Sequence, residues 1–384
     1  MEYRRFPKIQ DKEISVLGFG AMRLPVIGGK NECIDYDKTL SLIRTAWEHG
    51  INYYDTAYVY HGEKSEEVLG KALNELNIRD KVYIADKSPV WLVKDAKDWQ
   101  KLLDTQLTRL NTDHIDFYLM HALNSGSWKT ILEHDGLNFL EKAKKEGKIL
   151  HAGFSFHDEL SVFKTIVDGY SDWEFCQIQY NYLDTEYQAG LEGLTYANHK
   201  EIGVIVMEPL RGGMLANVAP AVQDIFAKTG MPRYPAEWAL RYVWEQQGVI
   251  TALSGMNDEV QILANCAAAS AAKPNSLPSS QIKIIEEAAQ WFKDRILSPC
   301  TGCRYCMPCP KGVFIPEILA ELNRVSMAGG LDNPERHAVS AAYRKLKAEN
   351  HGADLCVSCK ICESKCPQHI SISSILKDAE KALF

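Results

Sequence analysis

The sequence lacks several features that would place it in other classes of protein. No run of 18 or more apolar residues occurs, so no transmembrane helix is predicted. The opening segment MEYRRFPKIQDKE has no apolar core of the kind found in a signal peptide, and we expect a cytoplasmic protein. No charge of one sign dominates, because 43 Lys and Arg stand against 50 Asp and Glu. The net charge of −7 therefore argues against nucleic acid as a partner.

Up to residue 270, eight short β-rich runs alternate with amphipathic helical segments. The runs are 14–19, 51–55, 82–86, 115–120, 149–154, 175–180, 203–208 and 249–253. Strands that alternate with helices predict βαβ units with parallel pairing. Eight such units favour an α/β fold of the closed (β/α)8, or TIM-barrel, type. An open doubly wound sheet is the alternative, but the first βα turn lacks the GxGxxG fingerprint of such sheets.

The chain of 384 residues is long enough for two or three domains. Residues 271–280, AAKPNSLPSS, are rich in Pro and Ser and are typical of a linker. We therefore expect a barrel domain over 1–280, a linker helix over 281–299 and a small, mainly helical domain over 300–384. Within this last domain we expect an apolar helix face formed by Ile315, Ile318, Leu319 and Leu322.

Four polar residues lie where barrel enzymes carry out their chemistry, at the C-terminal ends of the strands. Asp55, Lys87 and His121 each follow a predicted strand, and Tyr60 lies in the loop after Asp55. A phenol, with an ordinary pKa of about 10, becomes a better proton donor beside an ammonium group. A carboxylate holds that ammonium group, and an imidazole orients a substrate carbonyl. Any one of these residues could instead cap a helix, but four complementary types together favour a proton-transfer site.

The segment DTAYVYHGEKSEEVLGKAL (55–73) resembles the signature of the aldo-keto reductases, in which the catalytic tyrosine follows an aspartate by five residues. VYIADK, ending at Lys87, and IDFYLMH, ending at His121, resemble the lysine and histidine segments of that family. GFS, QIQYN, MEPLRGGML and LSGMNDEVQILAN extend the resemblance further along the chain. The resemblance implies a catalytic tetrad of Asp55, Tyr60, Lys87 and His121, with Tyr60 as general acid and hydride supplied by NAD(P)H.

The resemblance also implies a set of residues that bind the nucleotide. They are Ser155, Gln177, Leu210, Gly212, Gly255 and Asn265. Three positions depart from the family pattern. Phe156 replaces the asparagine that helps to hold the carboxamide, and Met207 replaces the aromatic residue that stacks on the nicotinamide. Gln261 stands where an arginine would bind a 2′-phosphate, and arginine is the natural partner of that group.

Eight of the 11 cysteines lie in two runs, CTGCRYCMPCP (300–310) and CVSCKICESKCP (356–367). A reducing cytoplasm does not support structural disulfides, so the runs indicate metal binding. The second run is C-x2-C-x2-C-x3-C-P, the pattern of bacterial ferredoxins. Structural zinc is the alternative, because paired C-x2-C also occurs in zinc ribbons. The isolated Cys33, Cys176 and Cys266 are assigned no role.

In two-cluster ferredoxins the fourth cysteine of each run ligates the other cluster. We therefore expect two 4Fe-4S clusters held by interleaved quartets. One quartet is Cys356, Cys359, Cys362 and Cys309, and the other is Cys300, Cys303, Cys306 and Cys366.

The chain as a whole resembles the subfamily of aldo-keto reductases that carries a C-terminal ferredoxin-type domain. The expected function is the interconversion of a small-molecule carbonyl and an alcohol with NAD(P)H, coupled to electron transfer through the clusters to a redox protein partner. Two alternatives stay open: a nicotinamide-independent reductase fed by the clusters, with a flavin, and a redox-sensing barrel that binds a partner protein. Neither nucleic acid nor a membrane is expected as a partner.

Overall fold

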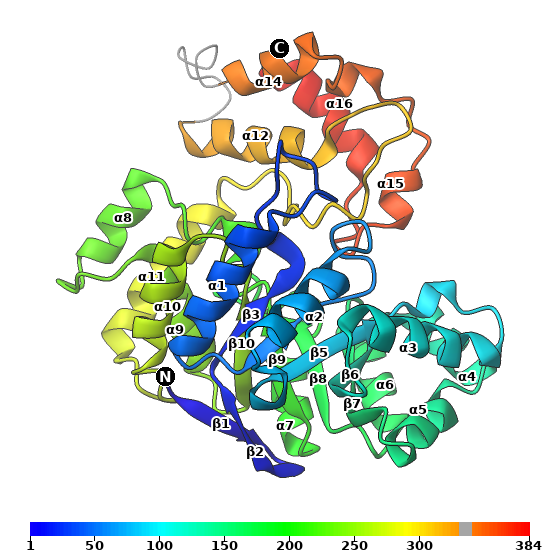
Figure 1. Ribbon diagram of the computed structural model, residues 1–384. Helices are drawn as coiled ribbons and strands as arrows, with labels where there is room; N and C mark the ends of the chain where they lie inside the picture. The colour runs from blue at the N-terminus through cyan, green and yellow to red at the C-terminus, as the bar shows by residue number, and fades with distance from the viewer. Residues whose placement is uncertain (330–339) are drawn as a thin grey trace. The chain divides into compact units, whose positions relative to one another are not determined.

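The computed structural model describes residues 1–329 and 340–384 (Figure 1). The chain divides into two compact units, of which the first comprises Met1–Pro209 and Ala239–Leu277, and the second comprises Leu210–Trp238 and Pro278–Phe384. The domain limits expected at residues 280 and 299 both fall inside the second unit and stay predictions. No helix in the described part of the chain is long and apolar enough to cross a membrane.

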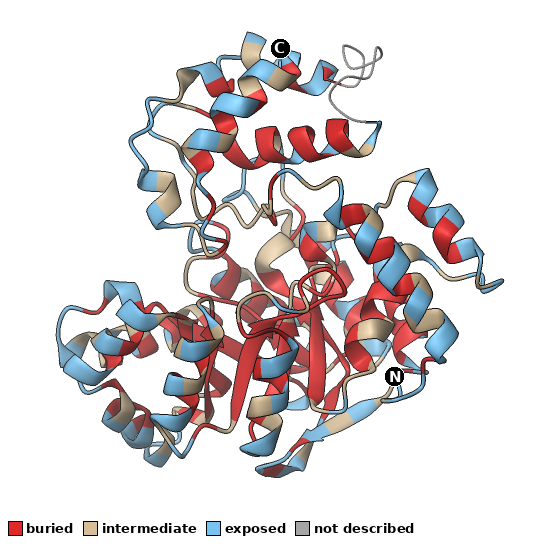
Figure 2. Cartoon of the chain, turned by 180° about the vertical axis from the view of Figure 1, so that it is seen from behind, coloured by how far each residue is buried: buried red, intermediate tan, exposed pale blue. Residues whose placement is uncertain are grey.

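A closed barrel of eight parallel strands forms the centre of the first unit, with the order β10-β3-β4-β5-β6-β7-β8-β9. The strands are β3 (Leu17–Gly20), β4 (Tyr53–Asp55), β5 (Tyr83–Ser88), β6 (Ile115–Leu123), β7 (Ile149–Phe156), β8 (Phe175–Gln179), β9 (Gly203–Met207) and β10 (Val249–Ser254). All eight predicted runs thus contribute a barrel strand, and the closure between β10 and β3 confirms the TIM barrel over the open sheet. Figure 2 shows the buried residues concentrated in these strands.

A two-stranded antiparallel sheet precedes the barrel and was not predicted. It consists of β1 (Tyr3–Phe6) and β2 (Ile9–Ser15). The expected first strand, 14–19, is therefore divided between the end of β2 and β3. Phe6 is fully buried in a core cluster that includes residues from the N-terminal halves of the barrel strands, and its ring centroid lies 5.2 Å from that of Phe117. The small sheet thus packs at the end of the barrel opposite the C-terminal strand ends.

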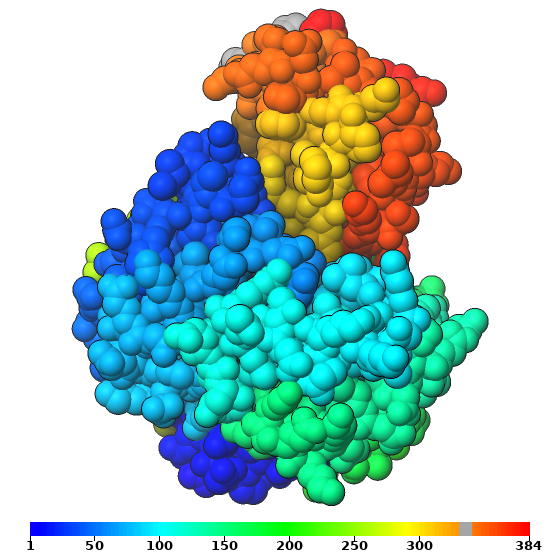
Figure 3. Space-filling model, turned by 45° about the vertical axis from the view of Figure 1, so that its right-hand side comes forward, coloured from blue at the N-terminus to red at the C-terminus, as the bar shows by residue number. Residues whose placement is uncertain are grey.

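Helices follow the strands and cover the outside of the barrel (Figure 1). They are α1 (Tyr36–Glu48), α2 (Ser65–Glu75), α3 (Ala96–Leu110), α4 (Ser125–Glu133), α5 (Gly136–Lys145), α6 (Leu160–Asp168), α7 (Gly190–His199), α9 (Pro235–Trp244) and α10 (Glu259–Ala269). In the space-filling view the surface passes from blue through cyan to green as successive βα units follow one another (Figure 3).

Local sequence sets the ends of these helices, and α3 is an example. Asp95 and Asp98 form a capping box at its start, so backbone N–H groups that lack helical partners are satisfied. Asn111 ends the helix in the left-handed conformation with φ of 49°, which asparagine adopts more readily than most residues. These caps fix the length of a helix that carries two residues of a network behind the candidate site.

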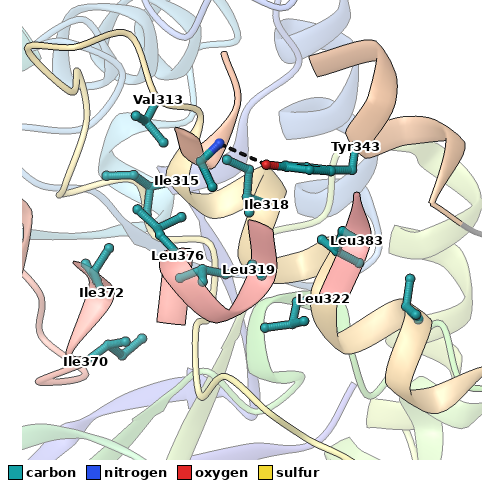
Figure 4. Close-up of a cluster of buried hydrophobic side chains, with 13 residues drawn as sticks. Val313, Ile315, Ile318, Leu319, Leu322, Tyr343, Ile370, Ile372, Leu376 and Leu383 are labelled. Carbon is teal, nitrogen blue, oxygen red and sulfur yellow. Dashed lines mark hydrogen bonds between the residues drawn. The ribbon is translucent and has the colours of Figure 1, made fainter. Parts of the chain in front are cut away.

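The second unit is built from helices and loops. Its helices are α8 (Pro220–Ala227), α11 (Ser279–Lys293), α12 (Ile315–Met327), α14 (Ala341–Ala348), α15 (Ile361–Ser364) and α16 (Ile372–Leu383). The apolar face expected on α12 is confirmed, because Ile315, Ile318, Leu319 and Leu322 are all buried. Figure 4 shows them packed against Leu376 and Leu383 of α16.

Two polar contacts stabilise this small helical core. The Tyr343 hydroxyl accepts a hydrogen bond from the Ala353 N–H at 3.1 Å, which is the dashed line in Figure 4. Asn323 of α12 accepts hydrogen bonds from the N–H groups of Leu297 and Ser298 and donates one to the Ser298 carbonyl. Because Asn323 is almost fully buried, its satisfied amide joins the chain after α11 to the helical core.

Candidate functional site

The four residues predicted to form a proton-transfer site lie together at the C-terminal ends of neighbouring strands. Asp55 ends β4, Lys87 is in β5 and His121 is in β6, while Tyr60 lies in the loop after β4. Lys87 Nζ donates hydrogen bonds to Asp55 Oδ1 and to the Thr56 carbonyl, both at 2.6 Å. It also lies 3.5 Å from the Tyr60 hydroxyl, toward which it donates. The arrangement places an amine between a carboxylate and a phenol.

Burial controls the charges in this group. Only 8% of Tyr60 and 1% of Lys87 is exposed. Burial raises the pKa of Asp55, and the neighbouring Lys87 ammonium opposes this rise. The pKa of His121 is held well below its ordinary value, first by burial and then by the positive charges of Lys87 and His157. His121 is therefore a neutral imidazole, and its ring meets that of Tyr60 edge-on at 6.3 Å between centroids.

An aromatic side chain lies beside this group at the surface. Trp91, in the short helix η3 (Val90–Leu92), is 48% exposed, and its ring centroid lies 5.1 Å from that of His121. An exposed tryptophan adjoining a buried imidazole offers an apolar surface to a small molecule that approaches His121.

Two of the expected nucleotide-binding residues lie on neighbouring strands of the same barrel. Ser155 Oγ, on β7, accepts a hydrogen bond from the Ala122 N–H at 2.7 Å. Gln177, on β8, donates toward Met207 Sδ at 3.6 Å. Among the described residues its buried Oε1 has no hydrogen-bond partner. A buried amide oxygen of this kind suits a ligand that brings its own N–H donor, so the pair fits a carboxamide.

Two of the departures from the family pattern, Phe156 and Gln261, have other contacts in the structure. Phe156 follows Ser155 on β7 and therefore points to the opposite face of the strand. It is fully buried, with its ring 5.1 Å from that of Phe163 on α6, and so belongs to the packing of strand and helix. Gln261 is exposed, and it exchanges hydrogen bonds with Asn257, which precedes Asp258, the N-cap residue of α10.

The remaining expected nucleotide residues are divided between the two units. Asn265, on α10 of the first unit, donates to Ser254 Oγ at 3.4 Å, and a Cβ placed on Gly255 would contact the Arg23 side chain at 3.1 Å. Leu210 and Gly212 belong to the second unit, where Leu210 precedes the short helix η4 (Arg211–Gly213). Their roles in nucleotide binding stay predictions.

Gly212 has a conformational and a packing reason to be glycine. Its φ is +67°, in the left-handed region, and a Cβ there would lie 2.2 Å from the carbonyl oxygen of Thr301. Thr301 directly follows Cys300, so the first cysteine run packs closely on the backbone of η4 within the second unit.

The first predicted cysteine quartet converges on one cavity in the second unit. Cys300, Cys303, Cys306 and Cys366 line it, together with apolar residues of α12 and of the segment before α16. Burial raises the pKa of the Cys306 thiol to about 12, and the neighbouring thiols of Cys303, Cys300 and Cys366 act in the same direction. Thiols from two runs so far apart in sequence thus surround one partly enclosed, mainly apolar space, as a cluster ligated by four thiolates requires.

The second quartet lies on the same helical core but is more open. Cys309, Cys356 and Cys362 pack against the core cluster, whereas Cys359 is exposed. None of the cysteines is in a disulfide. In the described part of the chain, no three His, Cys, Asp or Glu side chains are placed to bind one metal ion.

A buried polar network behind β5 was missed by the sequence reasoning. It joins Glu66 of α2 to Gln106 and Arg109 of α3. No motif marks it, because its partners are 40 and 43 residues apart. They become partners because α2 packs beside α3.

A family model described as "Aldo/keto reductase family" matches residues 16–290, and one described as "4Fe-4S dicluster domain" matches residues 299–371. The fold and the strand-end residues define an α/β-barrel oxidoreductase with a ferredoxin-type appendage. The chain belongs to the aldo/keto reductase family and carries a C-terminal 4Fe-4S dicluster domain.

Known proteins resemble different parts of the chain. L-galactose dehydrogenase of Arabidopsis thaliana is 30% identical to this chain over 217 residues. The match covers 54% of this chain and 65% of that enzyme, which is less than two thirds of its length. Aldo-keto reductase AKR11C1 from Bacillus halodurans, in its holo form, superimposes with a TM-score of 0.61 at 24% identity, covering 75% of this chain and 96% of that one.

An aldo-keto reductase from Klebsiella pneumoniae, solved in complex with NADPH, gives a TM-score of 0.59 at 21% identity and covers 74% of this chain and 94% of its own. These structural matches show the shared barrel fold.

Proposed function

We propose that this chain is an aldo-keto reductase that interconverts a small carbonyl compound and its alcohol with NAD(P)H, and that its clusters exchange electrons with a redox protein partner. The observation that carries the proposal is the position of Lys87 Nζ, 2.6 Å from Asp55 Oδ1 and 3.5 Å from the Tyr60 hydroxyl. The Klebsiella pneumoniae relative was solved with NADPH, which supports the choice of nucleotide.

In the reductive direction, Tyr60 gives its phenolic proton to the carbonyl oxygen as that oxygen gains electrons. Lys87 stabilises the phenolate that remains, because its ammonium lies beside the hydroxyl and is held by Asp55. The neutral His121 imidazole orients the carbonyl through a hydrogen bond. Ser155 and Gln177 hold the carboxamide. When bound, the reduced nicotinamide supplies hydride to the carbonyl carbon.

In the second unit, the proposal assigns Cys300, Cys303, Cys306 and Cys366 to one cluster. It assigns the other cluster to the more open quartet of Cys309, Cys356, Cys359 and Cys362. When bound, such clusters supply one-electron transfer. The more exposed quartet is then the one that faces a partner protein, since Cys359 lies at the surface.

Tyr60→Phe tests the proton-donor role. We expect kcat for aldehyde reduction to fall by about 100-fold or more, the usual contribution of a general acid, while the dissociation constants of NADH and NADPH stay unchanged. Anaerobic nucleotide oxidation and nucleotide fluorescence titration measure the two quantities. Tyr36→Phe is the matched control, because it removes a phenol hydroxyl of α1 that donates a hydrogen bond to Glu75 of α2 at the protein surface.

A Tyr60→Phe variant with wild-type kcat would exclude Tyr60 as the general acid. If the wild-type protein binds neither nucleotide, that result supports the alternative function, in which the clusters supply electrons to a nicotinamide-independent reductase. Met207 beside Gln177, in place of an aromatic residue, favours that alternative.

A further inference from the structure

Between the barrel strands and the outer helices, buried polar side chains connect α3 to β5, the strand that carries Lys87. Gln106 is fully buried, and its Nε2 donates to the Lys87 carbonyl at 3.0 Å and to Asp86 Oδ2 at 2.8 Å. Glu66 Oε1 also lies 3.2 Å from this nitrogen, so its two N–H groups are shared among three acceptors, while the Tyr118 hydroxyl donates to Gln106 Oε1 at 2.8 Å. Because every polar atom of this buried amide is engaged, the position of the Lys87 backbone is tied to α3.

Arg109, one turn farther along α3, attaches the same network to the loop that carries Tyr60. Its Nη1 donates to the fully buried Glu66 at 2.9 Å, and its Nη2 donates to Glu63 at 2.6 Å. Its guanidinium lies 4.2 Å from the ring centroid of Tyr58. Arg109 therefore contacts the loop two residues before Tyr60 and three residues after it.

The loop needs such anchoring because its backbone is strained. His61, Gly62 and Glu63 have φ values of 53°, 60° and 70°, three successive residues in the left-handed region. Residues other than glycine stay in this region only where their surroundings hold them. The Leu24 N–H donates to His61 Nε2 at 3.1 Å on one side of the loop. Arg109 holds Glu63 on the other side.

We propose that Arg109 is a positioning residue that sets the separation of the Tyr60 hydroxyl and Lys87 Nζ. Through Glu63 and Tyr58 it fixes the loop of Tyr60. Through Glu66 and Gln106 it is connected to the strand of Lys87. Since stabilisation of a phenolate by an ammonium group falls with distance, loss of either connection weakens it. This inference rests on the proposed function of Tyr60 and Lys87.

A purely structural role for Arg109 predicts different behaviour from a positioning role. The charged and titratable groups around Tyr60 include Lys87 on β5, with its partner Asp55 on β4, and His121 on β6. If Tyr60 moves away from Lys87, the phenol keeps its proton to higher pH. The alkaline limb of the pH profile of kcat then moves to higher pH, while the maximum value of kcat falls. Loss of stability alone lowers the amount of active enzyme without moving that limb.

The experiment compares Arg109→Met and Arg109→Lys with Arg79→Met in the full-length protein containing its clusters. Arg79 is a matched control, because it is also a largely buried arginine in an ion pair, with Asp116 at 3.0 Å, but it lies before β5 and away from the Tyr60 loop. For Arg109→Met we expect kcat to fall about 10- to 100-fold, as for a misplaced catalytic group. We expect the nucleotide dissociation constants to be unchanged and the alkaline limb of the pH profile of kcat to move to higher pH. Arg109→Lys keeps one charged contact and recovers part of kcat.

For Arg79→Met we expect a lower melting temperature with wild-type kcat and pH profile. The inference is overturned if Arg109→Met, folded by circular dichroism, keeps the wild-type kcat and profile, or if Arg79→Met moves the profile equally. If Arg109→Met does not fold, Arg109→Lys and Glu63→Gln give the same measurements with a milder change. An active Tyr60→Phe variant would instead remove the proposed function itself, so the two failures are distinguishable.

Discussion

Lys87 and Asp55 form an ion pair with almost no solvent contact, since 1% and 4% of their side chains are exposed. Removing two charges from water costs more than their attraction returns unless further hydrogen bonds complete the site. The Thr56 carbonyl provides one such bond to Lys87. The pair is thus poor evidence for a stabilising role. Its position at the strand ends, beside a phenol, is better explained by chemistry.

His121 makes stability depend on pH. In the folded chain its pKa is held well below the ordinary value by burial, Lys87 and His157. Below about pH 6.5 the unfolded chain binds a proton at this histidine and the folded chain does not. The unfolded state then binds more protons, so the free energy of unfolding falls as the pH falls. The loss contributed by this group is at most about 1.4 kcal/mol per pH unit.

His121→Gln removes this contribution while keeping a polar side chain. We expect its melting temperature to fall less than that of the wild type between pH 7.5 and pH 5.5, measured anaerobically. His199→Gln, on the exposed surface of α7, is the control and should follow the wild type. Equal pH slopes for His121→Gln and the wild type would contradict the assignment of a neutral, buried imidazole.

Site residues at the strand ends could be located from the sequence, but the polar residues buried between the strands and the outer helices could not. Asp55, Lys87 and His121 each follow a recognisable strand, and parallel strands in a barrel bring such ends together. Arg109 and Glu66 lie on two helices, 43 residues apart, and only the packing of α2 beside α3 makes them partners. The outward direction of Phe156 likewise depends on the exact register of β7.

At the scale of elements, apolar strands were easier to predict than the small sheet before them. The eight barrel strands are buried and read as apolar runs, as parallel strands do. In contrast, β1 and β2 are rich in charged residues, with YRRF and IQDKEIS as their sequences. Only Phe6, Ile9 and Ile14 point to the core, too few to give a clear alternation. Antiparallel pairing with one face in solvent explains the weak signal.

The short helix η4 provides a test of how it packs on the first cysteine run. Gly212→Ala adds a Cβ at φ of +67°, 2.2 Å from the Thr301 carbonyl oxygen. Gly213→Ala adds one at φ of +94° with nothing within 4 Å. Both variants carry backbone strain of about 1–3 kcal/mol. Only Gly212→Ala must also displace the loop after Cys300.

We therefore expect Gly212→Ala to lower the melting temperature more than Gly213→Ala and to bind less iron. Differential scanning calorimetry and an iron assay on anaerobically purified protein measure both effects. Equal melting temperatures and equal iron contents of the two variants would show that the contact with Thr301 does not contribute to stability.

At the scale of the whole molecule, each of the two units of the described chain contains a hydrophobic core of its own. The core of the first unit includes residues of the small N-terminal sheet and of six barrel strands. The core of the second unit has 13 buried residues. Six of the eight clustered cysteines, all except Cys303 and Cys359, pack against this core. A core this small gains much of its stability from bound metal, because ligand binding that requires the folded state stabilises that state.

Removal of iron should therefore loosen the second unit and leave the barrel intact. The anaerobic holoprotein is expected to contain about eight iron atoms per chain, as two cubanes require. After chelation, we expect amide hydrogen exchange to become at least about tenfold faster in α12 and α16, while exchange in the barrel strands β4–β7 stays unchanged. Cys366→Ser should lose iron and show the same pattern in part. Cys33→Ser, an exposed cysteine outside the two runs, is the matched control and should retain iron and protection. If exchange in α12 and α16 is the same with and without iron, the helical core is stable by itself and the clusters serve electron transfer alone.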